Sequence, residues 1–271
     1  SDVFNITINL TGFGKDIARY SDGSVFIIPD SDWQSVLQLV PITTWKETNS
    51  TILSSCNKGH GTDSDICIYP SLIFHEESDT SFDPDSTIHF LQQYPLTNIT
   101  LIGSTPSEFD NLLTAAYPTG AGVFSGQISR VDVANLLDYW GDYSSVIYSQ
   151  NDYETALLAS TYASLKNSPL IIRGGVLDSD SNFAGKNITC VGNLSGSGRA
   201  CIKNYTIAQL KMQYKNETNS TRLLLVNPDD LTIKTSLTFY PEKRSSNPIS
   251  NIYTKTSLAA PFLASAKKEI I

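Results

Sequence analysis

Short apolar segments alternate along the chain with longer segments that have helical spacing. Residues 25–28 and 146–148 are apolar, and each run is followed by an aspartate and then by apolar residues that recur every three or four positions. A buried strand that leads into a helix capped by Asp32 or Asp152 has this pattern. Because such strand–helix pairs recur, the sequence predicts an α/β fold built from tandem Rossmann-like βαβ units with parallel sheets.

The pattern repeats after about 120 residues, and this periodicity sets the predicted domains. Asn-Ile-Thr-Leu-Ile-Gly at 98–103 parallels Asn-Ile-Thr-Cys-Val-Gly at 187–192, and a further strand is expected at 66–69 in the first copy and at 169–172 in the second. A third start at 222–226 leads to a helix at 256–266 and stops at Ile271. The predicted divisions are an N-terminal strand segment (1–22), a first α/β unit (23–142), a second unit (143–220) and a partial third unit (221–271).

Residues 4–11 alternate strictly between apolar and polar side chains, which predicts a half-buried N-terminal strand. The third unit has a first half and no second half, so its sheet should keep an open edge. The sequence favours a chain that continues past Ile271 with the missing half. The alternative is a strand from the N-terminus of the same chain or from a neighbouring subunit.

Asparagines in Asn-x-Ser/Thr triplets are frequent. Of 18 asparagines nine lie in such sequons, whereas about four would arise by chance from the Ser and Thr content. The triplets become glycosylated only in a chain that passes through a secretory or surface pathway. The predicted glycosylation sites are Asn5, Asn9, Asn49, Asn98, Asn187, Asn193, Asn204, Asn216 and Asn219.

The four cysteines form two pairs of identical spacing. Cys56 and Cys67 are eleven positions apart, as are Cys190 and Cys201. Four cysteines permit three connectivities, and the locality of the loops favours the sequential pairing. Zinc is the competing interpretation, but neither pair has Cys-x-x-Cys spacing. Disulfides require an oxidising exterior, so they agree with the sequons.

The segment from Gly126 to Ile172 resembles a known repeat family. Gly-Gln-Ile-Ser-Arg-Val-Asp at 126–132, Asp-Tyr-Glu-Thr-Ala-Leu at 152–157 and Asn-Ser-Pro-Leu-Ile-Ile at 167–172 are similar to the cell-wall-binding repeat type 2 and to related repeats of archaeal surface proteins. The resemblance implies that the Ile-Ser-x-Arg stretch opens a helix. It also implies tandem Rossmann-like units, an extracytoplasmic position and no enzyme activity in the repeats.

Charge and composition exclude several classes of protein. A net charge of -8 argues against nucleic-acid binding, and no apolar run is long enough to span a bilayer. Asp178, Asp180 and Asn182 place side-chain oxygens at alternate positions, as a calcium loop does, but glycine and the distal glutamate of such a loop are missing. No other metal and no cofactor is expected, and calcium remains open.

The search for catalytic motifs is negative. The glycines at 120–126 lack a preceding strand, Ser195 is outside a Gly-x-Ser-x-Gly elbow, and the three histidines lack metalloprotease spacing. The sequence therefore predicts a non-enzymatic, glycosylated, extracellular cell-surface protein: a homo-oligomeric subunit of an archaeal-type surface layer or filament in the cell envelope. The alternatives are an anchoring module that binds a cell-wall polymer, and an extracytoplasmic enzyme or solute-binding protein.

Overall fold

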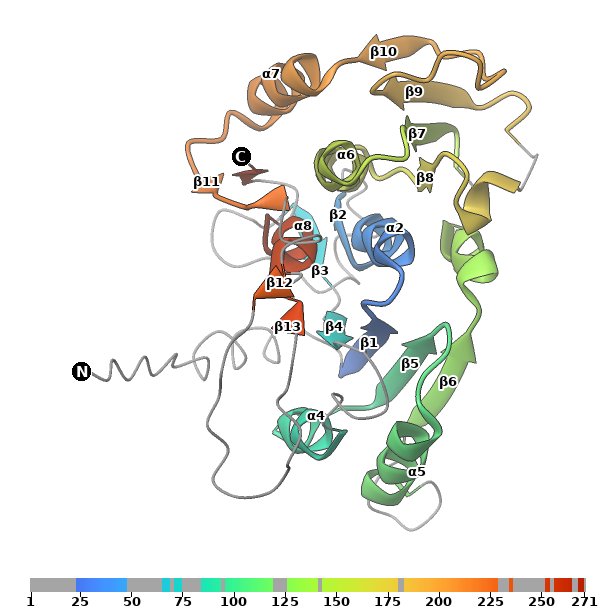
Figure 1. Cartoon of the computed structure of the whole chain (residues 1–271), viewed down its shortest axis with the longest axis vertical. Helices are drawn as coiled ribbons and strands as arrows, with labels where there is room; N and C mark the ends of the chain where they lie inside the picture. The colour runs from blue at the N-terminus through green and yellow to red at the C-terminus, as the bar shows by residue number, and fades with distance from the viewer. Residues whose placement is uncertain are drawn as a thin grey trace. The chain divides into compact units, whose positions relative to one another are not determined.

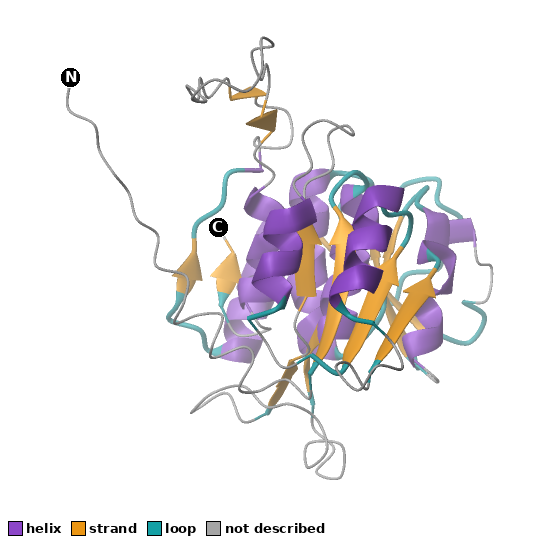
Figure 2. Cartoon of the chain, turned by 90° about the horizontal axis from the view of Figure 1, so that it is seen from below, coloured by secondary structure: helices purple, strands orange, loops and turns teal. Residues whose placement is uncertain are grey.

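The structure is a computed structural model that describes residues 23–47, 65–68, 71–74, 84–93, 96–118, 126–140, 143–179, 183–228, 234–235, 252–253, 256–264 and 268–270. The predicted N-terminal strand at 4–11 lies outside these residues. Contacts divide the chain into two compact units, Ser1–Pro29 with Glu47–Asp132 and Asp30–Lys46 with Val133–Ile271. Figure 1 labels the helices and strands, and Figure 2 distinguishes them by colour.

The first unit contains a parallel four-stranded sheet. Its strands are β1 (Ser24–Pro29), β4 (Ser71–Phe74), β5 (Asn98–Ile102) and β6 (Gln127–Val131), in the order β4-β1-β5-β6. The short strand β3 (Ile66–Ile68) precedes β4. This arrangement confirms the α/β class with a parallel sheet.

Two helices cover one face of this sheet. Helix α4 (Pro84–Leu91) contributes Ile88 and Leu91, and helix α5 (Ser107–Ala116) contributes Phe109 and Leu113 to one apolar cluster. Residues of alternate positions on β1 and β5 complete the cluster, because alternate side chains of a strand share one face. They are Val25, Ile27, Ile99 and Leu101.

The second unit contains a sheet of the same strand order. Its strands are β7 (Ser145–Ser149), β8 (Leu170–Ile172), β9 (Asn187–Val191) and β10 (Lys203–Tyr205), arranged β10-β9-β7-β8 and all parallel. The register also agrees between the sheets: Ser24 of β1 lies opposite Asn98, and Ser145 of β7 lies opposite Asn187. In chain order, both sheets therefore have strand order 2-1-3-4, a doubly wound arrangement.

Helix α6 (Tyr153–Lys166) is the centre of the second unit. It contacts β7, β8, α2 (Trp33–Thr43), α7 (Ile207–Thr218) and α8 (Ala260–Ala264), and Figure 1 shows it beside β7 and β8. A helix that is surrounded on most sides lacks a polar stripe. In agreement, α6 buries every residue from Thr155 to Leu165 and carries small side chains at Ala159 and Ala163.

Both aspartates that were expected to begin helices do so. The Asp32 carboxylate accepts a hydrogen bond from the Gln34 N–H at 3.0 Å and caps α2, while Asp152 accepts from the Thr155 N–H at 2.9 Å and caps α6. Each cap satisfies an amide that the helix leaves unpaired. The predicted strand–Asp–helix pattern is thus confirmed at both places.

The last described elements form a smaller strand pair in the second unit. Strands β11 (Leu223–Leu224) and β14 (Glu269–Ile270) are parallel, and between them come β12 (Lys234–Thr235), β13 (Ile252–Tyr253), a 3₁₀ turn η5 (Thr256–Ala259) and α8. A strand, a helix and a parallel strand therefore follow one another in the predicted third start. Among the described residues, β11 pairs with β14 and with no further strand.

Two sequence expectations need correction. Of the segment expected as a strand at 66–69, residues 66–68 form β3, but the strand beside β1 is β4, so residues 71–74 match β8. The Ile-Ser-x-Arg stretch opens no helix: it is β6, parallel to β5, and the 3₁₀ helix η2 (Val133–Trp140) comes after it. No helix in the described part of the chain has the length and apolar character needed to cross a membrane. The remaining short strand, β2 (Thr44–Lys46), follows α2.

Candidate functional site

Three predicted glycosylation sites gather around β9 and β10. Asn187 begins β9, Asn193 lies just after it and Asn204 is the middle residue of β10. All three side chains are exposed. Exposure is what a glycan requires, since it adds a bulky polar group that only solvent can accommodate.

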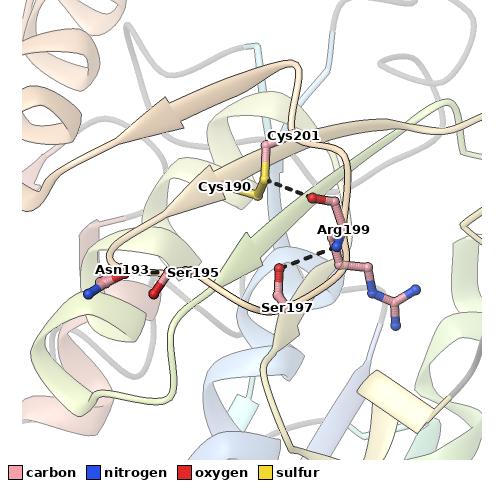
Figure 3. Close-up of a disulfide and its surroundings, with 6 residues drawn as sticks. All are labelled: Cys190, Asn193, Ser195, Ser197, Arg199 and Cys201. Atoms are coloured by element: carbon pink, nitrogen blue, oxygen red, sulfur yellow. Dashed lines mark hydrogen bonds between the residues drawn. A yellow bond between two sulfur atoms is a disulfide. The ribbon is translucent and has the colours of Figure 1, made fainter.

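A disulfide closes the segment that carries Asn193. Cys190 on β9 bonds to Cys201, with their Cα atoms 5.7 Å apart, and Figure 3 shows the loop between them. The Ile202 N–H donates to the Ile188 carbonyl at 2.8 Å, so the chain enters β10 directly beside β9. This confirms the predicted Cys190–Cys201 pair. Cys67 is buried in β3, while Cys56 lies outside the described residues, so their pairing stays a prediction.

The first turn of this loop depends on glycine. Gly192 has φ +89°, and a Cβ atom there would lie 2.7 Å from Oε1 of Gln150. That same oxygen accepts a hydrogen bond from the Asn193 N–H at 2.6 Å. Gln150 directly follows β7, and its side chain lies beside Gly192, which directly follows β9. The Asn193 side chain accepts from the Ser195 N–H at 3.2 Å and tightens the turn.

Arg199 holds the C-terminal part of the loop that the disulfide closes. The Arg199 guanidinium donates to both the carbonyl and the carboxylate of Asp178 at 3.1 Å, and it lies 4.3 Å from the centre of the Phe183 ring. The same carboxylate accepts from the Gly174 N–H at 2.8 Å and from the Tyr148 hydroxyl at 3.2 Å. Charge-assisted bonds of this kind are stronger than neutral ones. The loop is therefore held by a covalent bond and by an ion pair.

Burial raises the pKa of the Tyr148 hydroxyl above its ordinary value, and the neighbouring Asp178 carboxylate raises that pKa further. The hydroxyl thus stays protonated at neutral pH. It therefore acts as a hydrogen-bond donor to the Asp178 carboxylate.

Two further sequons lie on α7. Asn216 is in the last turns of the helix, and Asn219 caps its end with φ +51°, in the left-handed region that asparagine tolerates. Both are exposed. A capping box between Thr206 and Gln209 begins the helix, and Thr206 is also the third residue of the Asn204 sequon.

Glu217 connects α7 to α6. Its carboxylate forms an ion pair with Lys166 and accepts from the Gln213 amide at 2.5 Å and the Tyr162 hydroxyl at 3.2 Å. Burial alone would raise the pKa of Glu217, but the hydrogen bonds from Lys166 and Gln213 outweigh it, so this pKa lies below its usual value. Burial and the Glu217 charge raise the pKa of Tyr162. The two sequons thus stand on a helix that is anchored to the core.

Of the remaining predicted glycosylation sites, Asn98 is the one that lies within the described residues. Asn98 begins β5, is exposed, and donates to the Ser24 hydroxyl at 3.4 Å. Asn5, Asn9 and Asn49 lie outside the described residues.

The calcium candidate is described only at Asp178. Its carboxylate is occupied by Arg199, Gly174 and Tyr148, while Asp180 and Asn182 lie outside the described residues. Among the residues that the structure describes, no group of three or more His, Cys, Asp or Glu side chains is arranged to hold a metal ion. No described residue therefore supports the calcium loop beyond the sequence pattern itself.

Sequence reasoning missed the contacts that hold the disulfide loop. Arg199 and Asp178 are far apart in the sequence, and neither lies in a recognisable motif. Gly192 has a sequence signal, since a glycine follows both β5 and β9, and both Gly103 and Gly192 have positive φ. Comparison with known proteins finds no matching protein family, no similar curated protein and no similar solved structure.

Proposed function

We propose that the chain is a structural, glycosylated cell-surface protein, a subunit of a surface layer or an extracellular filament. The observation that carries the proposal is the β9–β10 segment, where a disulfide closes the loop and three exposed sequon asparagines surround it. Disulfides and N-linked glycans share one requirement, passage through an oxidising export pathway. A covalent cross-link and a sugar coat also suit a protein that must persist outside the cell.

We further propose that the two sheets are tandem copies of one ancestral unit. Their common strand order supports this idea, as does the equal register of Ser24–Asn98 and Ser145–Asn187. The third strands also share the pattern exposed, buried, half-buried, buried, buried. Repeated units of this kind suit extended surface assemblies.

The test is made on native material. Glycopeptide mass spectrometry of the purified cell envelope should find the chain there, with glycans on the six exposed sequon asparagines Asn98, Asn187, Asn193, Asn204, Asn216 and Asn219. Labelling of the chain on intact cells should give a continuous layer or filaments. A chain with bare asparagines that is missing from the envelope would overturn the proposal.

The main alternative, an anchoring module that binds a cell-wall polymer, predicts a different result. Such a module would co-sediment with isolated cell wall as a monomer. Repulsion between an acidic chain and anionic wall polymers argues against it.

A further inference from the structure

The open edge of β11 is the most informative unpartnered feature of the described chain. Leu223 is 56% exposed and Leu225 is 78% exposed, although both belong to an apolar run beside a parallel strand. The β11–β14 pair can be compared with the β7–β8 pair of the second sheet by placing Ile270 at the position of Ile171. Leu223 then takes the position of Ile147, and Leu224 takes that of Tyr148. Both Ile147 and Tyr148 are buried. The difference has a simple cause: β7 has a strand on each side, whereas β11 has a described strand on one side.

The two complete sheets show what this edge lacks. In each, residues lie side by side across the strands in a row, with Ile27 next to Leu101 in the first sheet and Ile171, Tyr148 and Cys190 together in the second. These side chains are almost fully buried. The corresponding row of the third pair contains buried Ile270 and half-buried Leu224, and its third member is missing from the described residues.

In each complete sheet, the strand that comes third in chain order has the same sequence signature. Strand β5 reads Asn-Ile-Thr-Leu-Ile and β9 reads Asn-Ile-Thr-Cys-Val. The N-terminal segment of this chain reads Asn-Ile-Thr-Ile-Asn at positions 5–9. Its first three residues are identical to those of β5 and β9, and its fourth is apolar as in both strands, where the first four side chains are exposed, buried, half-buried and buried.

The fifth position departs from the signature in an informative way. Ile102 and Val191 are fully buried at this place, whereas the N-terminal segment has Asn9, a sequon asparagine. On the third strand pair, residues of this face would lie beside Leu223 and Leu225, which are exposed. A polar, glycosylated side chain fits there and would fit neither complete sheet. The one position at which residues 5–9 differ in polarity from β5 and β9 therefore lies on the face where Leu223 and Leu225 are exposed, whereas the same position is buried in the two complete sheets.

We propose that residues 5–9 of a second copy of this chain pair in parallel with β11 and complete the third sheet, so that copies join head to tail. The register of the complete sheets places Ile8 opposite Leu224 and Thr7 opposite Leu223. Main-chain hydrogen bonds would supply affinity, and the row Ile270–Leu224–Ile8 would supply specificity. This interface rests on the proposed assembly function and deepens it.

We favour a second copy as the partner of β11. The donor segment (residues 5–9) and the acceptor edge (β11) are different surfaces of the same chain. A contact between unlike surfaces leaves each new copy with one free donor and one free edge, and therefore propagates into rings or filaments. Residues 10–23 join the segment to β1, and these fourteen residues span at most about 50 Å when extended. That length lets the segment reach a neighbouring molecule.

The decisive experiment uses two complementary full-length variants. The donor variant Ile6→Asp/Ile8→Asp keeps both sequons and an intact β11, and the acceptor variant Leu224→Lys keeps the N-terminal segment. Each alone should be monomeric in sedimentation, with association weakened at least tenfold from the wild type, and an equimolar mixture should give dimers. Thermal melting confirms that Leu224→Lys folds. A wild-type chain that stays monomeric, or a Leu224→Lys chain that assembles normally, overturns the interface.

A cross-link tests the register independently of assembly strength. The double variant Ile8→Cys/Leu224→Cys should form bonds between two chains on mild oxidation, while the shifted pair Ile8→Cys/Leu225→Cys should not. A bond within one chain, or none at all, refutes pairing with a second copy. A chain that is abundant in envelope assemblies while these tests fail leaves the proposed function standing and removes only the interface.

Discussion

Gly192 is constrained twice, by its backbone angle and by the side chain beside it. A left-handed residue with a Cβ atom costs about 1–2 kcal/mol, and here the new atom would also meet Gln150. The Gln150 side chain cannot move without losing its hydrogen bond to the Asn193 amide.

We expect Gly192→Ala to lower the free energy of unfolding by about 2–4 kcal/mol, the sum of backbone strain and a clash. Gly196→Ala is the matched control, since Gly196 has φ +73° and no atom within 4 Å of a new Cβ. It should lose only the strain. Urea denaturation measures both, and equal losses would contradict the role assigned to Gln150.

Glu217 contributes to the free energy of unfolding, and the direction in which this contribution changes with pH follows from its pKa. Because its pKa is lowered in the folded chain, its stabilisation is present at neutral pH and disappears as the pH falls through the folded pKa. Glu217→Gln should cost about 1 kcal/mol at pH 7, allowing for the partial exposure of Lys166. The Asn216 sequon stays intact.

The measurement is chemical denaturation of both chains between about pH 3 and pH 7. The difference between Glu217→Gln and wild type should shrink towards zero at the acidic end. The exposed Asp138→Asn change serves as control and should stay within about 0.5 kcal/mol throughout. A difference that grows on acidification would refute the contribution of the ion pair.

At the scale of elements, α6 depends on small side chains in a fully packed environment. Ala163 is completely buried between neighbouring elements, so a larger side chain has no space. Ala163→Leu should destabilise the chain by about 1–3 kcal/mol. Ala208→Leu, at an exposed position of α7, should be nearly neutral in the same thermal melt. Equal effects would mean that α6 is less tightly packed than described.

Strand β10 depends on the disulfide. Replacing Cys190 and Cys201 with Ala should cost about 3 kcal/mol on the chain-entropy estimate for a loop of this length. Hydrogen exchange should then accelerate first at Lys203–Tyr205, because β10 is an edge strand. Exchange that changes uniformly over β7, β8 and β9 would contradict this order.

The elements predicted from the sequence are those that depend on near neighbours. Asp32 and Asp152 cap the expected helices, because spacing and caps are local properties. The place of β4 beside β1 was missed, since two apolar runs lie close together and only packing decides which joins the sheet. The Arg199–Asp178 ion pair was missed for a related reason, because no local sequence pattern indicates which distant residue a charged side chain will contact.

At the scale of the whole molecule, net charge should govern association. Copies with a charge of -8 repel one another, while the proposed contact uses main-chain groups and apolar side chains. Raising NaCl from about 20 to 200 mM shortens the screening length from roughly 20 to 7 Å. Association should therefore strengthen severalfold with salt in sedimentation experiments. EDTA in every sample separates screening from bridging by calcium, and weaker association at high salt would indicate ion pairs between copies.

The crossover that leaves the third strand differs between the two sheets. Residues 103–126 include helix α5, which packs over Leu101, whereas residues 192–202 contain no helix and the aligned position is occupied by Cys190. A covalent bond in the second sheet thus stands where the first has a packed helix. The rim of the second sheet can consequently reach its final form only where an oxidant is present. The thiol chemistry of the compartment therefore decides when β10 becomes fixed beside β9.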